Sequence, residues 1–431
     1  MRTQRPFDSS ICLKPLVKPL ALMGWLAIGS SMALWAAPTV VRDWVSASGT
    51  RITASAESVN ANIVVLRTAD RKVVQVPMEK FSAADIALLQ KHFNLAAAGE
   101  ISQSAVVSVE DSLKWPLGKM AGPIEAAPGS TYYLYLPKQL PKGRKHPLLM
   151  VLDPHHGKEA SIQRYYAGAE RNGWIIITSV ESANETDGKS VIPSIDHALA
   201  NLPIDPERIY LGGFSGGSSR SFRLSKQAKA AGVLACGMGA CGAPLDRDLT
   251  IYAMAGTQCW NRDNTAASLT ALGTKAKNSF MRYFVGKHEW AGSELMDDGI
   301  THLNAVFLAD HRKVHAEEAW QCEAEILRLA ASLKSSNPGR ALMWTSFLTD
   351  RKVDPRLTAG LDTLHRELLA DAAAKKYVDG MIAINQLAIK KIGQNGMEGA
   401  KKDLEKLAAE YASTPWGDIC RKLQEPSEKS R

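Results

Sequence analysis

Cysteine is scarce in this sequence: there are six in 431 residues, and no group of them has the spacing of a zinc site. Glycine (32 residues) and proline (20 residues) are too few for a collagen-like or low-complexity chain, and 45% of the residues are hydrophobic. No run of lysine and arginine is interleaved with aromatic residues, and no internal repeat has a clean period. These absences exclude a disulfide framework, a collagen-like chain and a disordered chain, and they argue against nucleic-acid binding and a metal site.

The formal net charge of +8 is concentrated at the amino terminus. The first 18 positions hold four basic residues and one acid, so the rest of the chain carries +5. Spread over that length, the excess is weak evidence for a nucleic-acid partner. At roughly 100 to 200 residues per domain, the length predicts two or three folded units.

Residues 1–37 have the pattern of a secretory signal peptide. Positively charged residues precede an apolar stretch from Pro19 to Trp35, which ends in small residues at Ala36-Ala37-Pro38. The alternative is an uncleaved membrane anchor, because the apolar stretch approaches the ~20 residues that span a bilayer. Small residues within and after the stretch favour cleavage, so we expect a secreted or periplasmic protein without stable membrane insertion once the leader is removed.

Export would place the cysteines in an oxidising compartment. Cys12 lies in the leader, and the five others are Cys236, Cys241, Cys259, Cys322 and Cys420. Because their number is odd, at least one thiol is expected to stay free or to pair between chains.

Residues 38–95 are predicted to form a small β domain that ends in one short helix. Runs rich in β-branched residues at 52–56, 63–66 and 73–76 are separated by polar turns. Three short strands are marginal alone, so they must curl into a barrel or pack on a neighbour. Residues 96–129 are rich in Ala, Ser and Gly and are predicted to be a linker.

Strand-like and helix-like segments alternate from 130 to 312, which predicts a doubly wound α/β domain with a mostly parallel sheet. The expected strands lie at 132–136, 147–152, 174–178, 208–211, 232–235, 251–255 and 281–285. Helical patterns lie between them at 162–171, 195–202 and 218–229. Chemistry in such a sheet is expected at the carboxyl ends of the strands.

Residues 313–431 are predicted to form an all-helical domain. Apolar residues recur at spacings of three and four in four segments and a short last helix, at 316–333, 357–375, 378–391, 397–411 and 414–423. Asn337-Pro338-Gly339 and residues 393–396 are expected to interrupt the helices.

The run Gly213-Phe214-Ser215-Gly216-Gly217 follows a predicted strand directly and precedes a helical segment. This strand, sharp turn and helix form the setting of a nucleophile elbow, in which glycines relieve collisions around a strained serine. Ser215 is therefore the candidate nucleophile, and the Gly216 N–H is a candidate oxyanion donor. The alternative is a tight turn with an idle serine.

A serine nucleophile requires a base, and His288 supplies the candidate. It lies in Gly286-Lys287-His288-Glu289-Trp290, directly after the last predicted strand. The other downstream histidines, His302, His311, His315 and His365, lie in helical stretches and are interpreted as solvated or packing residues.

Residues 130–312 resemble the α/β-hydrolase superfamily, in particular its compact esterases of the dienelactone-hydrolase and polyester-depolymerase type. The resemblance rests on the elbow at 213–217, on the run at 286–290 and on Leu152-Asp153-Pro154-His155-His156-Gly157. It implies that the backbone near His155 and His156 supplies the second oxyanion N–H. Their imidazoles either orient substrate or are merely exposed in the loop.

The acid departs from the family pattern. Only Asp246, Asp248 and Asp263 lie between Ser215 and His288, with no glutamate. The first two precede a strand, whereas Asp263 follows it in the loop where the family carries its acid. The family places that acid about three residues after the glycine that ends the strand, where this sequence has Cys259. We therefore take Asp263 as the candidate acid.

Three of the cysteines follow neighbouring predicted strands. Cys236 and Cys241 follow one strand and Cys259 follows the next, so a disulfide from Cys259 to either is a hypothesis from their order alone.

Within residues 38–95, a second resemblance is carried by Arg42-Asp43-Trp44, Gly49, Val65-Leu66, Asp70-Arg71-Lys72, Val76-Pro77, Lys80-Phe81-Ser82 and Asp85. The segment resembles the SHD-type domain, a small SH3-like module. That resemblance implies an interaction or packing module, with a protein partner or a stabilising cap as the two interpretations.

Together these features predict an exported serine hydrolase that cleaves carboxylic esters through Ser215, His288 and an acid. No metal or organic cofactor is required. Phenolic or acetyl esters on polysaccharides would suit an exported enzyme of this type. The alternatives are a serine peptidase on the same scaffold and a non-catalytic binding protein that retains a hydrolase fold.

Overall fold

The computed structural model describes residues 42–46, 50–60, 63–68, 73–92, 113–141, 143–184, 188–246, 248–272 and 278–428. The chain divides into two compact units, Met1–Val107 and Ser108–Arg431. The predicted leader, Cys12 and most of the predicted linker lie outside the described residues.

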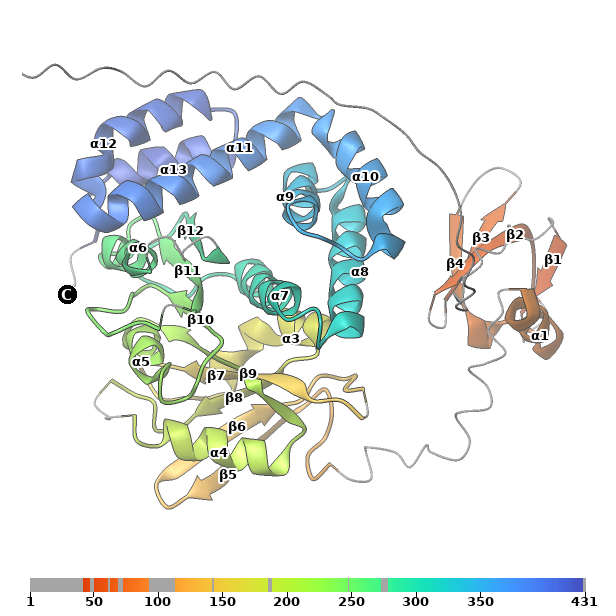
Figure 1. Ribbon diagram of the computed structural model, residues 1–431, viewed down its shortest axis with the longest axis horizontal. Helices are drawn as coiled ribbons and strands as arrows, with labels where there is room; N and C mark the ends of the chain where they lie inside the picture. The colour runs from red at the N-terminus through yellow and green to blue at the C-terminus, as the bar shows by residue number, and fades with distance from the viewer. Residues whose placement is uncertain are drawn as a thin grey trace, which may run out of the picture. The chain divides into compact units, whose positions relative to one another are not determined.

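The first unit contains a four-stranded antiparallel sheet and one helix (Figure 1). Its strands follow one another in sequence order, and its elements are β1 (Arg42–Val45), β2 (Arg51–Asn60), β3 (Ile63–Thr68), β4 (Val73–Pro77), a 3-10 helix (Met78–Lys80) and α1 (Ala83–His92). Trp44 is fully buried at the centre of the core, and its indole N–H donates to the Ala54 carbonyl over 2.9 Å. The three strands predicted from the sequence are present, and the SH3-like resemblance stays a prediction.

The second unit is built on an eight-stranded sheet with the order β12-β11-β10-β9-β7-β8-β6-β5 (Figure 1). The strands are β5 (Met120–Ala127), β6 (Ser130–Tyr135), β7 (His146–Leu152), β8 (Ile175–Ser179), β9 (Ile204–Phe214), β10 (Gly232–Cys236), β11 (Thr250–Gly256) and β12 (Phe280–Phe284). Only β6 runs against the rest, because it pairs antiparallel with both β5 and β8, whereas every other pair of neighbouring strands is parallel. This order and these directions confirm the predicted α/β-hydrolase fold.

The prediction that residues 96–129 form only a linker is wrong for the end of that segment. Residues Met120–Ala127 form β5, the first strand of this sheet. β5 is an edge strand that pairs only with β6, and two irregularities interrupt the pairing. Its sequence, MAGPIEAA, has few β-branched residues, so its composition carries little strand signal.

Helices cover both faces of the sheet. Along β7, Leu149 and Val151 face α3 and α7, whereas Leu148 and Met150 face α4, as the alternation of side chains along a strand requires. The helices are α2 (Glu159–Ile162), a 3-10 helix (Gln163–Tyr165), α3 (Tyr166–Asn172), α4 (Val191–Asn201), α5 (Gly216–Leu224), α6 (Arg262–Ala271) and α7 (Ser293–Asp310). The chemistry-bearing loops at the carboxyl edge therefore stand on a sheet buried on both sides.

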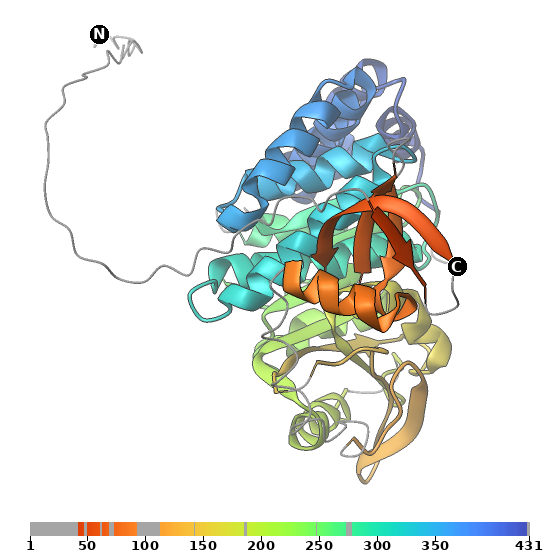
Figure 2. The ribbon, with the colours of Figure 1, turned by 90° about the vertical axis from the view of Figure 1, so that its right-hand side faces the viewer.

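The carboxyl-terminal helices pack against the β12 end of the sheet (Figures 1 and 2). They are α8 (Ala316–Leu333), α9 (Pro338–Thr349), α10 (Pro355–Leu369), α11 (Ala372–Leu387), a π-helix (Ala388–Ile392), α12 (Gly393–Glu410) and α13 (Pro415–Gln424). One hydrophobic core joins side chains of β11 and β12, such as Ala253 and Met281, to Met381 of α11 and Trp416 of α13. The helical region predicted as a separate domain from 313 is thus part of the same compact unit as the sheet.

The break predicted at Asn337-Pro338-Gly339 is the start of α9. The Asn337 side chain accepts the Arg340 N–H over 3.1 Å, and Pro338 occupies the first helical position, where its missing N–H costs nothing. α8 already ends at Leu333, so the predicted break is present, and the helix that follows it, α9, is the element that the sequence did not predict.

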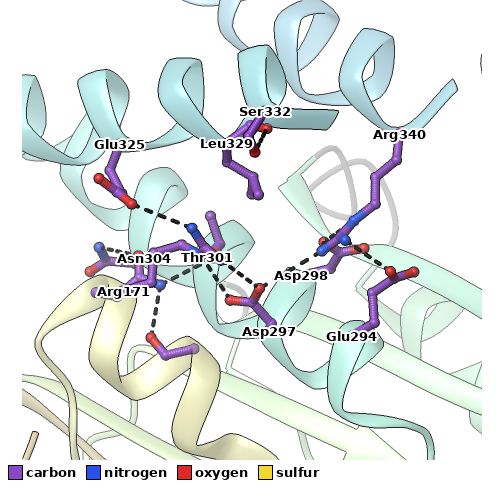
Figure 3. Close-up of polar contacts among 12 residues, drawn as sticks. Arg171, Glu294, Asp297, Asp298, Thr301, Asn304, Glu325, Leu329, Ser332 and Arg340 are labelled. Atoms are coloured by element: carbon purple, nitrogen blue, oxygen red, sulfur yellow. Dashed lines mark hydrogen bonds and ion pairs between the residues drawn. The ribbon is translucent and has the colours of Figure 1, made fainter. Parts of the chain in front are cut away.

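Two arginines link α7 to the helices around it (Figure 3). Arg171 of α3 pairs with Asp297 over 3.1 Å and with Glu325 of α8 over 3.3 Å. Arg340 of α9 donates to Asp298 Oδ1 over 2.7 Å, and it also pairs with Glu294 over 2.9 Å. These charged contacts hold α9 in one register on α7, because each buried charge requires its partner.

No helix in the part of the chain that the structure describes is both long and apolar enough to span a bilayer.

Replacing Arg340 with methionine is expected to destabilise the second unit. The Asp298 side chain is 1% exposed, so its carboxylate would remain buried with its ion-pair partner removed. Breaking a buried pair in this way costs about 3 to 5 kcal/mol of unfolding free energy, measured here by urea denaturation. Lys334→Met is the matched control, since its ion pair with Glu367 is about half exposed on both sides and contributes less than about 1 kcal/mol. Equal losses in the two variants would contradict the assigned role of Arg340.

Candidate active site

Ser215 stands at a sharp turn between β9, which ends at Phe214, and α5, which begins at Gly216. Its backbone has φ 52° and ψ −123°, a region that non-glycine residues rarely adopt. A Cβ at Gly213 or at Gly217 would collide with the Leu152 carbonyl oxygen at the end of β7. The close approach of β7 therefore explains the two flanking glycines, as the sequence predicted for a nucleophile elbow.

His288 lies in the loop between β12 and α7, and its Nε2 is 2.8 Å from Ser215 Oγ. The residues that the sequence singled out as nucleophile and base are thus within hydrogen-bond distance. Burial lowers the pKa of His288 from its usual value of 6.5, because the surroundings solvate the imidazolium poorly. The imidazole is accordingly neutral at neutral pH, the form that can accept a proton from a serine hydroxyl.

Cys259 occupies the other side of the His288 ring, with its Sγ 3.1 Å from Nδ1. The side chain is fully buried, and burial raises the pKa of the thiol to about 11. At neutral pH the group that faces Nδ1 is therefore an uncharged thiol.

The contacts of Cys259 favour one histidine tautomer. Its Sγ lies 3.7 Å from the Gly237 carbonyl oxygen, which the thiol hydrogen can reach, and the sulfur accepts the Asn261 N–H over 3.4 Å. With the thiol hydrogen directed at Gly237, the sulfur is left to accept the proton on Nδ1 of His288. Nε2 then has a free lone pair for the Ser215 hydroxyl.

The structure places Asp263, the predicted acid, away from His288. Asp263 lies in the first turn of α6, and its side chain is 45% exposed. Its Oδ2 accepts the Met397 N–H over 3.0 Å, beside Gly396, whose φ of 69° interrupts α12. Asp263 therefore joins α6 to α12, and it forms no hydrogen bond with His288 in the described structure.

The carboxyl-terminal segment holds the loop that carries Cys259. Gln258 donates its side-chain amide to Glu425 over 3.0 Å and accepts the Glu428 N–H at its carbonyl over 3.0 Å. Arg262 reaches the Glu425 carbonyl over 2.9 Å and also bonds the Thr257 carbonyl. The end of the helical region thus fixes the position of the thiol.

The predicted oxyanion donors differ in whether their N–H groups already have a hydrogen-bond acceptor. Gly216 is the first residue of α5, so its N–H has no partner within the helix and points from the helix amino terminus. The His155 N–H already donates to Asp153 Oδ1 over 2.9 Å, and the His156 ring contacts the Val180 carbonyl over 3.0 Å. Gly216 is the predicted donor that best meets the requirement for an available N–H.

Asn184 is a polar residue beside the elbow that sequence reasoning missed. It follows β8 at the carboxyl edge of the sheet, and a Cβ at Gly216 would collide with its side-chain amide. Its backbone N–H donates to the Pro154 carbonyl over 3.0 Å, which joins it to the loop after β7. Its position after a strand of the parallel sheet is the only sequence signal that would have indicated it.

Aromatic rings surround the candidate base. The centroid of Trp260 is 3.8 Å from that of His288, and Phe214 lies 4.7 Å away. Trp290 contacts Phe214 and stacks under the Arg164 guanidinium at 4.4 Å. Trp260 remains 39% exposed, so part of the apolar side chain that packs against His288 is open to solvent.

The disulfide hypothesised for Cys259 is absent from the described part of the chain. All five cysteines beyond the leader are free thiols. Cys236 contacts the Ala291 N–H over 3.3 Å and Cys241 contacts Asn264 over 3.2 Å, whereas Cys259 faces His288. The neighbouring strands bring the cysteines to one edge of the sheet, but their side chains have other partners.

Within the described residues, no cluster of three or more His, Cys, Asp and Glu side chains is arranged to hold a metal ion. Of the histidines interpreted as packing residues, His302 is buried and bonds the Asn278 carbonyl over 2.8 Å.

Several solved structures are similar to part of the chain. FphF, described as a fluorophosphonate-binding serine hydrolase of Staphylococcus aureus, is 11% identical with a TM-score of 0.37, over 44% of this chain and 99% of its own. S-formylglutathione hydrolase FrmB of the same organism is 14% identical with a TM-score of 0.35, over 44% and 98%. A truncated carbohydrate esterase from gut microbiota is 14% identical with a TM-score of 0.36, over 44% and 97%. No protein-family model matches the sequence, and no curated protein matches it.

Iodoacetamide is expected to alkylate the exposed thiol of the folded protein and to leave the buried thiols unmodified. Cys241 is exposed, whereas Cys236, Cys259, Cys322 and Cys420 are buried and burial raises the pKa of each to about 11 or 12. Alkylation requires an accessible thiolate, so the folded protein should react at Cys241 and the others only after unfolding. Peptide mapping by mass spectrometry without reductant checks both reactivity and pairing. A disulfide-linked peptide pair, or rapid alkylation of Cys259 in the folded protein, would contradict the structure.

Proposed function

We propose that the protein is a serine hydrolase that cleaves carboxylic esters. The observation that carries the proposal is the 2.8 Å contact between His288 Nε2 and Ser215 Oγ at a strained turn between strand and helix. A strained backbone at an exposed edge of the sheet is costly, and such strain concentrates at sites where it serves a reaction. Export through the predicted leader remains part of this proposal.

In the proposed reaction Ser215 Oγ attacks the ester carbonyl while His288 Nε2 accepts its proton. The carbonyl oxygen becomes an oxyanion, which the Gly216 N–H at the amino terminus of α5 stabilises. His288 then returns the proton to the departing alcohol, leaving an acyl group on Ser215. Water activated by the same histidine releases the carboxylic acid and restores the hydroxyl.

Cys259 would act as a positioning residue in this scheme. Its sulfur accepts the Nδ1 hydrogen and so keeps the reactive tautomer. Because the thiol is neutral, it stabilises the imidazolium less than a carboxylate would. We therefore expect a slow hydrolase, best suited to esters with good leaving groups.

The surroundings of the site support a substrate with a flat or apolar group. The open face of Trp260 beside His288 offers a surface on which an aromatic or sugar ring can stack. Phenolic esters and esters on polysaccharides both carry such a ring. Amide cleavage demands protonation of a poor leaving group by a well-supported imidazolium, so the neutral thiol makes the peptidase alternative less favourable.

Labelling by a fluorophosphonate probe is expected for the wild-type protein and lost in Ser215→Ala. The probe phosphonylates an activated serine, so it reports the nucleophile without requiring the natural substrate. Asp263→Asn is the matched control, and it should label at close to the wild-type rate because Asp263 contacts Met397 instead of His288. A folded wild-type protein that resists labelling would favour the non-catalytic alternative. Loss of labelling in a folded Asp263→Asn variant would restore that residue as the acid.

The pH dependence of ester hydrolysis is expected to follow the neutral form of His288. Burial lowers the pKa of His288 from 6.5, so the neutral imidazole persists to a lower pH than in a solvated histidine. With p-nitrophenyl acetate, kcat/KM should rise with pH through a midpoint below 6.5 and be level at neutral pH. A midpoint above 6.5 would show that the charged form is stabilised, contrary to the neutral surroundings described for this ring.

A further inference from the structure

A cavity of about 190 Å³ lies among β12, α7, α9 and α11, separate from the candidate active site. Phe280, which lines it, is the first residue of β12, whereas His288 follows the last residue of that strand. The cavity and the candidate active site are therefore at opposite ends of the strands. An engineered protein cavity of about 150 Å³ accepts benzene, so this one has room for a ligand of about six to nine non-hydrogen atoms.

Arg282 of β12 is a buried cation in the cavity wall, 6% exposed. Its Nη1 contacts the sulfur atoms of Met343 and Met381 over 3.3 and 3.4 Å, and its guanidinium lies 5.3 Å from the Trp416 ring. Within the described residues, Nε has no hydrogen-bond acceptor, and the guanidinium forms no ion pair with a carboxylate. A guanidinium has five donors in a planar fork, so this one retains the capacity to bind a carboxylate.

Asp298 and Glu294 attract Arg282 through space and contribute to raising the pKa of its guanidinium, but neither forms a direct ion pair with it. Asp298 is held by Arg340 through two hydrogen bonds of 3.1 and 2.7 Å to its Oδ1, as Figure 3 shows. Burial lowers the pKa of His302 to about 4, so it is neutral. Arg351 adds a second positive charge, donating to the Phe347 carbonyl over 3.0 Å, and the exposed Asp350 is its neighbour in sequence. Arg340 is shared among Asp298, Asp297 and Glu294, so the group that favours an anion in the cavity is Arg282, whose Nε has no acceptor.

The rest of the lining is apolar. It includes the aromatic rings of Phe280, Trp344 and Phe347 and the flexible side chains of Met343 and Met381. Such walls accept a small hydrocarbon group, and methionine adapts to irregular shapes. A ligand that matches both Arg282 and the apolar lining has one anionic group and a short apolar body.

We propose that this cavity is a binding site for a small monocarboxylate with an apolar body, such as a short-chain fatty acid or an aryl carboxylate, whose carboxylate pairs with Arg282. The site does not depend on Ser215 or His288, so binding can be tested apart from hydrolysis.

Benzoate is the probe, and benzamide is its uncharged control of the same shape. Isothermal titration of the full-length protein should detect benzoate with a dissociation constant on the order of 1 mM or tighter, and benzamide roughly tenfold or more weaker. Arg282→Met should abolish benzoate binding, since it removes the charge and keeps an apolar side chain of similar length. Lys334→Met is the matched control, because it removes a positive charge that is about half exposed and outside the lining, and it should bind as the wild type does.

Val378→Phe tests the cavity independently of the charge. Val378 lines the cavity, so a larger side chain there fills the space of the apolar body while Arg282 stays in place. This variant should also lose benzoate binding, and it covers the case in which Arg282→Met fails to fold. Equal affinity for benzoate and benzamide, unchanged benzoate affinity in both folded variants, or no binding of benzoate to the wild type would each overturn the proposal.

Discussion

The hydrogen bond between Ser215 and His288 joins two loops that leave the same edge of the sheet, and the functional account depends on it. Parallel strands bring both loops to that edge, and the approach of β7 to Gly213 and Gly217 forces the sharp turn that presents Ser215. The helices packed on both faces keep the strands in register, so the two side chains meet without an ordering cost at the time of reaction. Preorganisation of this kind is what a hydrolase requires of its scaffold.

The carboxyl-terminal helices take part in the site through the loop that carries Cys259. Asp263 ties α6 to α12, and Glu425 and Glu428 bond Gln258, the residue before Cys259, while the Glu425 carbonyl also accepts from Arg262. A carboxylate in the expected loop therefore has a structural use in holding the helices. The helical region is better described as a support for the loop that carries Cys259 than as an independent domain.

Much of the fold could be predicted from the sequence because its strands are continuous apolar runs, as in the buried β7 and β10. β5 is not predicted because an edge strand with glycine and proline lacks that signal. The break at Asn337-Pro338-Gly339 is present between α8 and α9, but the sequence did not predict α9 as a helix. Ser215 and His288 could be located because glycines and strand ends mark their positions. The spacing after the strand places Cys259 at the acid's position, but the sequence favours Asp263 as the partner of Nδ1 because a carboxylate is the usual group there.

The central claim is that a neutral thiol supports His288 where a carboxylate would stabilise its charged form. The most direct measurement is the rate of acylation by p-nitrophenyl acetate, followed by stopped flow, for the wild type and Cys259→Asp. Cys259→Asp is expected to acylate faster by roughly tenfold or more, because a carboxylate beside Nδ1 stabilises the imidazolium that forms as Ser215 attacks. A folded Cys259→Asp protein that acylates no faster than the wild type would contradict the account.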